Sequence, residues 1–153
     1  MPSCYDKAVQ LLGSRPHFRR ELQAKLAQRG FPPEEIEEAL DRLAGQGYLD
    51  DIKTAVSFVE HRLERNAEGR LRLKAELEKR GAAPEAIESA LADLPDDDLE
   101  PAREAAERWA RLHPRGKGSS LAQHLSRKGF SRRAIFAVLT ERREDLDLDG
   151  IEE

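Results

Sequence analysis

A short pattern of leucine and glycine recurs three times along the chain. Two leucines and a glycine follow one another at intervals of four residues, and a basic residue precedes each glycine. An isoleucine comes six residues after the glycine, and another leucine four residues later. Because the copies are spaced by 51 and 48 residues, they predict a tandem array. The copies are Leu22-Leu26-Gly30-Ile36-Leu40, Leu73-Leu77-Gly81-Ile87-Leu91 and Leu121-Leu125-Gly129-Ile135-Leu139.

Each copy predicts a hairpin of two helices. Leucines at positions i and i+4 share one helical face, and the glycine takes the left-handed conformation that ends a helix. Pro33 and Pro84 lie where a first helical turn accepts proline, and Ser131 is a candidate N-cap in the third copy. The helix after the turn presents its isoleucine and leucine on one apolar face.

A further helix is expected before each hairpin. Ser3 is a candidate cap for the first, and either Asp50 or Asp51 for the second, while the third follows the acidic turn at 95–98. The chain is therefore predicted to be all-α, with three tandem modules of three helices at residues 1–49, 50–95 and 96–143. One module has too few apolar residues to be stable alone, so neighbouring modules must pack together or share helices.

Charged residues are unevenly distributed, with an acidic segment at the end of the sequence and a basic stretch before it. The net charge is −4, but residues 144–153 hold six acids and no base. We expect that segment to be a disordered acidic tail. From Arg108 to Arg133 there are eight Arg or Lys residues and no Asp or Glu. Such a local field suits an anionic partner whatever the overall charge.

No pattern of catalytic or cofactor-binding residues stands out. The acidic sequence at 145–150 begins like a calcium loop, but the chain ends before the required bidentate glutamate. The segment 116–120 lacks the glycine and the hydroxyl residue of a phosphate loop. The four histidines lack metal-ligand spacing. We therefore predict a non-enzymatic protein without metal or cofactor.

The single cysteine and the lengths of the apolar runs indicate where in the cell the protein is expected. Cys4 is the only cysteine, which fits a reducing compartment, and its expected state is a buried thiol. No apolar run approaches the roughly 20 residues needed to cross a bilayer, and no signal peptide is visible. We expect a cytoplasmic monomer that does not enter a membrane.

The candidate binding residues are basic side chains in the second and third modules. Solvation of a helix face is the better explanation of the cluster at residues 62–72 when it is taken alone. The long acid-free stretch at residues 108–133 is instead the electrostatic footprint of a nucleic acid or acidic protein partner. Trp109 is at an apolar position and is expected in the core. The candidates are Arg62, Arg65, Arg70, Arg72, Arg111, Arg115, Lys117, Arg127, Lys128, Arg132 and Arg133.

Several segments resemble the RecX regulatory family in order and spacing. The first is Arg15-Pro16-His17-Phe18-Arg19-Arg20-Glu21-Leu22, where the family usually has serine in place of Phe18. The most distinctive is Gly47-Tyr48-Leu49-Asp50-Asp51. The sequences Arg80-Gly81 and Lys128-Gly129-Phe130 resemble the second and third repeat signatures. The resemblance extends from about Ala8 to Leu139.

This resemblance implies a fold and a partner. The fold would be three tandem three-helix repeats in an elongated, curved array. The partner would be the filament that RecA forms on single-stranded DNA, with suppression of ATP hydrolysis, strand exchange and co-protease activity in DNA repair, recombination and the SOS response. A few family members stimulate RecA instead. The basic helices would contact RecA, single- or double-stranded DNA, or both.

Two other functions remain open from the residues alone. The run from Glu21 to Tyr48 also fits a helix-turn-helix or winged-helix DNA-binding protein. A wing would need a two-stranded hairpin, whereas residues 52–63 have helical spacing. A helical adaptor without any nucleic acid is the third reading.

Overall fold

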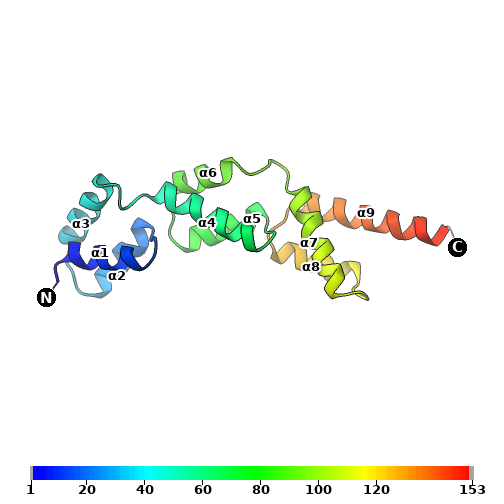
Figure 1. Ribbon diagram of the computed structural model, residues 1–153, viewed down its shortest axis with the longest axis horizontal. Coiled ribbons are helices and arrows are strands. Elements are labelled where there is room, and N and C mark those ends of the chain that lie inside the picture. The colour runs from blue at the N-terminus through cyan, green and yellow to red at the C-terminus, as the bar shows by residue number, and fades with distance from the viewer. Residues whose placement is uncertain (1, 152–153) are drawn as a thin grey trace. The chain divides into compact units, whose positions relative to one another are not determined.

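The computed structural model describes the backbone of residues 2–151 and the side chains of residues 2–143. Within that part of the chain every regular element is a helix, which confirms the all-α prediction (Figure 1). The nine helices described are α1 (Cys4–Ser14), α2 (Arg19–Gln28), α3 (Pro33–Gly45), α4 (Asp51–Arg65), α5 (Arg70–Lys79), α6 (Pro84–Ala92), α7 (Leu99–Leu112), α8 (Gly118–Arg127) and α9 (Arg132–Ile151).

The predicted helix ends are those of the structure. Pro33 and Pro84 are the first residues of α3 and α6, where the missing N–H of proline has no intrahelical partner in any case. Ser131 Oγ accepts a hydrogen bond from the Ala134 N–H at 3.2 Å and so caps α9. The three repeated glycines have φ between 87° and 91°, the left-handed conformation in which a side chain would be strained.

The hydrogen bonds at the start of α4 show which of the two candidate aspartates caps this helix. Asp50 Oδ1 accepts a hydrogen bond from the Lys53 N–H at 3.1 Å, so Asp50 is the cap. Asp51 instead accepts the N–H of Arg19, the first residue of α2, at 2.9 Å. The neighbouring acids Asp50 and Asp51 therefore serve two helices, because each satisfies an N–H that has no partner within its own helix.

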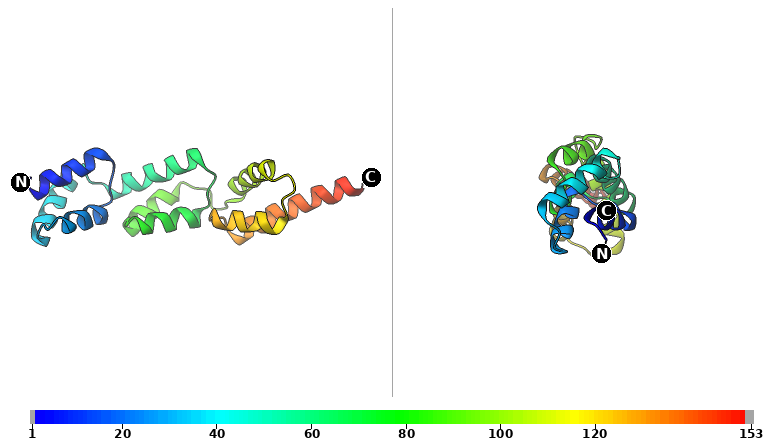
Figure 2. Two further views of the ribbon diagram at one scale, coloured as in Figure 1. Left: turned by 90° about the horizontal axis from the view of Figure 1, so that it is seen from below. Right: turned by 90° about the vertical axis from the view of Figure 1, so that its left-hand side faces the viewer.

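Contacts divide the chain into two compact units, and α4 and α5 contribute to both. Unit 1 comprises Met1–Val59 and Glu76–Ala92. In it, α1, α2 and α3 lie side by side (Figure 2) and enclose an apolar core. That core is built from the repeat positions Leu22, Leu26, Ile36 and Leu40, together with Cys4 and Ala8.

Unit 2 comprises Glu60–Ala75 and Asp93–Glu153. Here α7 and α8 pack on the first turns of α9, around Leu121, Leu125 and Phe130. Alanines line α7 on the side of this core, so the neighbouring helices approach it closely. Trp109 is partly buried and packs against the same cluster, as the sequence predicts.

Residues 144–151 of the acidic segment belong to α9, and the disorder that we expected of this tail stays a prediction. Once the first turns of α9 are formed, each further residue adds a backbone hydrogen bond without a new nucleation cost. The side chains of this segment lie outside the described residues. Its dispensability for folding stays a prediction, as do the module boundaries.

A buried histidine lies between α1 and α2. The side chain of His17 is 1% exposed. Its Nδ1 lies 2.9 Å from the Arg15 carbonyl oxygen, and its Nε2 lies 2.9 Å from Lys25 Nζ. A neutral ring that donates from Nδ1 and accepts from lysine at Nε2 satisfies both contacts. Burial lowers the pKa of His17, and the positive charges of Arg15 and Lys25 act in the same direction.

This histidine makes stability depend on pH. Above pH 6.5 the ring is neutral in both the folded and the unfolded chain, and its contribution is complete. As pH falls below 6.5, the unfolded chain takes up the proton first, so stability is lost down to the lowered folded pKa. We expect the free energy of unfolding to fall more between pH 7 and pH 5 in the natural chain than in His17→Gln. Urea titrations with parallel pH dependences would contradict this assignment.

Candidate partner-binding surface

All eleven predicted binding residues lie in unit 2. The structure separates them into side chains held by contacts inside the unit and side chains that face solvent. Arg62, Arg70 and Arg72 belong to the first group. Lys128 is half-buried, and the rest are exposed: Arg65, Arg111, Arg115, Lys117, Arg127, Arg132 and Arg133.

Arg62 and Arg72 hold a buried carboxylate that sequence reasoning missed. The side chain of Glu68 is only 2% exposed. Arg62 binds it with two hydrogen bonds, Nη2 to Oε1 at 2.6 Å and Nε to Oε2 at 2.9 Å. Arg72 Nε lies 3.2 Å from Oε1. A buried carboxylate is costly unless it is paired and hydrogen-bonded, so both guanidiniums have a structural role here.

The segment around Glu68 also caps the end of α8. The Gly69 N–H donates to the Lys128 carbonyl oxygen at 2.8 Å, and Arg72 Nη1 donates to the Arg127 carbonyl oxygen at 2.7 Å. These carbonyls are among the last of α8, which have no partner within their own helix. The start of α5 thereby fixes the end of α8 and, with it, the side chains of residues 127 and 128.

Gly69 is essential for this close approach. A Cβ atom at this position would lie 2.1 Å from the Gly129 carbonyl oxygen, which is backbone and has little room to move. We expect Gly69→Ala to lower the free energy of unfolding by about 2–3 kcal/mol, through overpacking and loss of the bond to Lys128. Gly13→Ala is the control, because nothing lies within 4 Å of its added Cβ. Equal urea midpoints for Gly69→Ala and the natural chain would show that the contact is not tight.

Arg70 has weaker internal partners. Its Nη2 lies 3.3 Å from the Leu94 carbonyl oxygen and 3.4 Å from that of Pro95. Both bonds are long, so they orient the side chain more than they stabilise it. Arg70 connects the start of α5 to the acidic turn before α7.

The seven exposed cations make no described contact that would stabilise the fold. None of them forms an ion pair with a carboxylate among the side chains of residues 2–143. Arg132 and Arg133 are in the first turn of α9, where the helix dipole disfavours positive charge. Arg111 and Arg127 lie in the last turns of α7 and α8, where the helix dipole favours a cation. None of the seven is held by a described ion pair, so their field is available to a partner.

Two large apolar side chains accompany the exposed cations. Phe136 is 73% exposed and follows Arg132 by one helical turn on α9. Leu112 is 79% exposed and is the last residue of α7, next to Arg111. Sequence reasoning did not single out either side chain, and their exposure in the structure identifies them. Apolar side chains among cations suit a protein surface better than a bare phosphate backbone.

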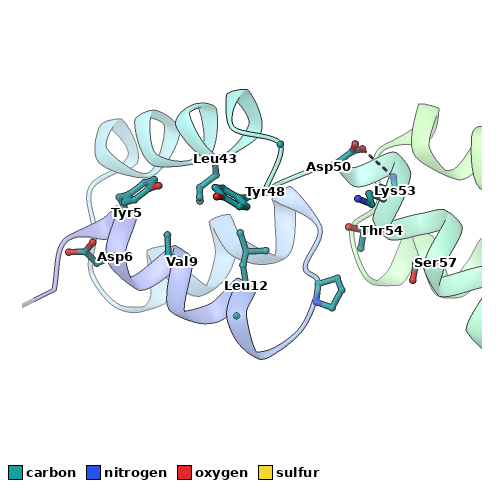
Figure 3. Close-up of a pocket in the computed structure, with 13 residues that line it drawn as sticks. Tyr5, Asp6, Val9, Leu12, Leu43, Tyr48, Asp50, Lys53, Thr54 and Ser57 are labelled. Atoms are coloured by element: carbon teal, nitrogen blue, oxygen red, sulfur yellow. Dashed lines mark hydrogen bonds between the residues drawn. The ribbon is translucent and has the colours of Figure 1, made fainter.

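Unit 1 contains a hollow that none of the predicted binding residues lines. It measures about 700 Å³ and lies beside α1, α3 and the start of α4 (Figure 3). Tyr5, Val9 and Tyr48 project toward it, and Asp50 is engaged in capping α4. Among the described side chains no group of His, Cys, Asp or Glu is arranged to hold a metal ion. No described helix has the length and apolar character needed to span a membrane.

Comparison with known proteins identifies relatives over most of the chain. Residues 4–43 match the RecX first three-helix domain, and residues 50–91 match the RecX second three-helix domain. "Regulatory protein RecX" of Halorhodospira halophila is 38% identical over 143 residues, which is 92% of this chain and 88% of that protein. The protein of the same name from Pseudomonas fluorescens is 38% identical over 141 residues, 90% of each chain.

Solved structures show the same fold. The crystal structure of RecX from Lactobacillus salivarius superposes with a TM-score of 0.79 at 24% identity, over 90% of this chain and 93% of that one. A second crystal structure, of a regulatory protein RecX, has a TM-score of 0.76 at 23% identity. The match covers 88% of this chain and 69% of the chain in that crystal structure. At these identities the likeness concerns the fold.

Proposed function

This chain belongs to the RecX family of regulatory proteins, and on that premise we propose that it binds the RecA filament on single-stranded DNA. Binding lowers the filament's ATP hydrolysis, strand exchange and co-protease activity. The protein acts as a docking regulator in DNA repair, recombination and the SOS response, without catalysis of its own. The proposal places it in the cytoplasm as a monomer.

The exposed cations of unit 2 are the observation that carries this proposal. Seven exposed Arg or Lys side chains lack ion-pair partners among the described residues, and α7 and α8 with their connecting loop have no acid between Arg108 and Arg133. We propose that these side chains fix the protein along the filament groove, against acidic protein surface, DNA phosphates, or both. Affinity should then fall steeply as salt rises, because charges are screened and counterions are released.

The internal roles of Arg62 and Arg72 narrow the proposed contact surface. Their guanidiniums pair with Glu68, so a partner would have to compete with a buried ion pair to engage them. We propose that Arg65, Arg111, Arg115, Lys117, Arg127, Lys128, Arg132 and Arg133 make the contacts, while Arg62, Arg70 and Arg72 hold the surface in place.

Comparison of two DNA substrates tests the choice of partner. We expect the protein to bind a RecA–single-stranded DNA filament at lower concentration than naked duplex DNA of equal length, measured by fluorescence anisotropy. Tighter binding to the duplex would favour a helix-turn-helix DNA-binding protein instead. No observation favours that alternative at present: the place of a wing is taken by α4, and the described backbone contains no strand.

A further inference from the structure

A second hollow lies within unit 2, beside α7 and α8. Its volume is about 420 Å³, within the range of roughly 300–1,000 Å³ that is usual for small-ligand sites. Three aromatic rings and three cationic side chains line it, and no Asp or Glu is among the lining residues. The rings are those of Trp109, His113 and His124, and the cations are Arg108, Arg127 and Lys128.

The rings are held in a fixed arrangement. The indole of Trp109 stacks on His113, with centroids 4.5 Å apart and planes inclined by 16°. His124 approaches the same indole at 6.4 Å with a tilt of 32°. His113 Nδ1 lies 2.9 Å from the Trp109 carbonyl oxygen, which orients the ring at the end of α7. At Gly116 an added Cβ would lie 2.2 Å from indole Cη2, so the loop closes directly on the tryptophan.

The electrostatic field inside the hollow is positive. Burial lowers the pKa of His124, and the charges of Lys128 and Arg127 lower it further. The same field that disfavours a proton on His124 favours an anion in the hollow. The capping of α8 by Gly69 and Arg72 fixes the backbone that carries Arg127 and Lys128, so these cations are positioned before any ligand arrives.

We propose that this hollow receives one nucleotide of single-stranded DNA. The phosphate faces Arg108, Arg127 and Lys128, and the base packs against the rings of Trp109, His113 and His124. Proteins that bind single strands combine a positive groove with aromatic platforms, because every base has a π-face. The carboxylate side chains of an acidic peptide offer the negative charge but no flat ring, whereas each nucleotide carries both in one unit. The choice of DNA rests on the proposed function, since the filament carries a single strand.

Trp109 provides the readout, because it is the only tryptophan of the chain. We expect its emission in the full-length protein to change saturably on titration with a short oligodeoxythymidylate. An abasic strand of equal length, polyglutamate and inorganic phosphate should each give less than half of this change at equal negative charge. No change with the oligonucleotide, or an equal change with any of the three comparison probes, would overturn the proposal.

Matched substitutions localise the site. Arg108→Gln should weaken oligonucleotide binding by about fivefold, as expected for loss of one partly desolvated charge contact. Arg29→Gln removes the same charge from an exposed position that neither lines the hollow nor belongs to the proposed contact surface, and should weaken binding by less than about twofold. His113→Ala should reduce the difference between the oligonucleotide and the abasic strand, because one of the three rings is lost. Equal effects of Arg108→Gln and Arg29→Gln would contradict a site in the hollow.

Two separate measurements test the nucleotide site and the proposed function. Titration with naked DNA contains no RecA, whereas filament ATP turnover requires it. If oligonucleotide leaves Trp109 unchanged but filament turnover still falls on addition of the protein, the nucleotide site is wrong and the proposed function stands. If the emission changes as expected but filament turnover does not respond, the nucleotide site is supported and the filament role is wrong.

Discussion

Leu77→Ala is expected to lower the free energy of unfolding by about 2–5 kcal/mol. Leu26, Leu77 and Leu125 are equivalent positions of the repeat, and each side chain is 0% exposed. Truncation of any of them removes buried methyl groups and leaves a cavity that the neighbouring helices fill only in part. We therefore expect losses in the same range at all three positions.

A matched control is available on the same helix as Leu77. Leu71 is 60% exposed, so Leu71→Ala should change the free energy of unfolding by no more than about 0.5 kcal/mol. Urea denaturation followed by far-UV circular dichroism measures all four variants. Absence of any loss at Leu26, Leu77 and Leu125 would show that the three copies are not structurally equivalent.

Reversal of four cations at the end of α8 and the start of α9 is the second change with a large expected effect. With Arg127, Lys128, Arg132 and Arg133 all replaced by Glu, we expect filament affinity to fall by about 100-fold or more, as four charge contacts are lost. Inhibition of filament ATP turnover should disappear at concentrations where the natural chain is effective. The fold should remain intact, since acids at 132 and 133 suit the dipole at the start of α9 and offset the cost of acids at 127 and 128 at the end of α8.

The control for this variant reverses four other exposed cations. Arg29, Lys53, Lys74 and Lys79 are exposed and lie outside the proposed contact surface, so their replacement by Glu causes the same change in net charge. We expect this control to retain most of the inhibition. If the 127–133 variant inhibits at natural concentrations with unchanged salt dependence, those four cations only solvate the third module. The contact surface would then have to lie elsewhere.

The features that the sequence predicted correctly are local. The spacing of Leu22 and Leu26 before Gly30 describes one helix face and its end, and both follow from backbone geometry within a dozen residues. Pro33, Pro84 and Ser131 mark helix starts for equally local reasons. Family resemblance added the proposed partner, which no local pattern contains.

The features that sequence reasoning missed depend on contacts between distant segments. Nothing near Glu68 indicates that its carboxylate is buried between Arg62 and Arg72. The backbone approach of Gly69 to Gly129 spans 60 residues of sequence. For this reason the sequence grouped all basic side chains together, whereas the structure separates those that stabilise unit 2 from those exposed to a partner. The stack of Trp109 on His113 was likewise hidden by the general expectation of a core tryptophan.

The most direct test of the proposed function is filament ATP turnover with and without the natural chain. RecA is assembled on single-stranded DNA with ATP, and the rate of phosphate release is followed as the protein is added. We expect turnover to fall progressively to a low plateau, and the protein concentration needed to rise with salt. Unchanged turnover at every protein concentration and at low salt would contradict the proposal that this chain inhibits the RecA filament.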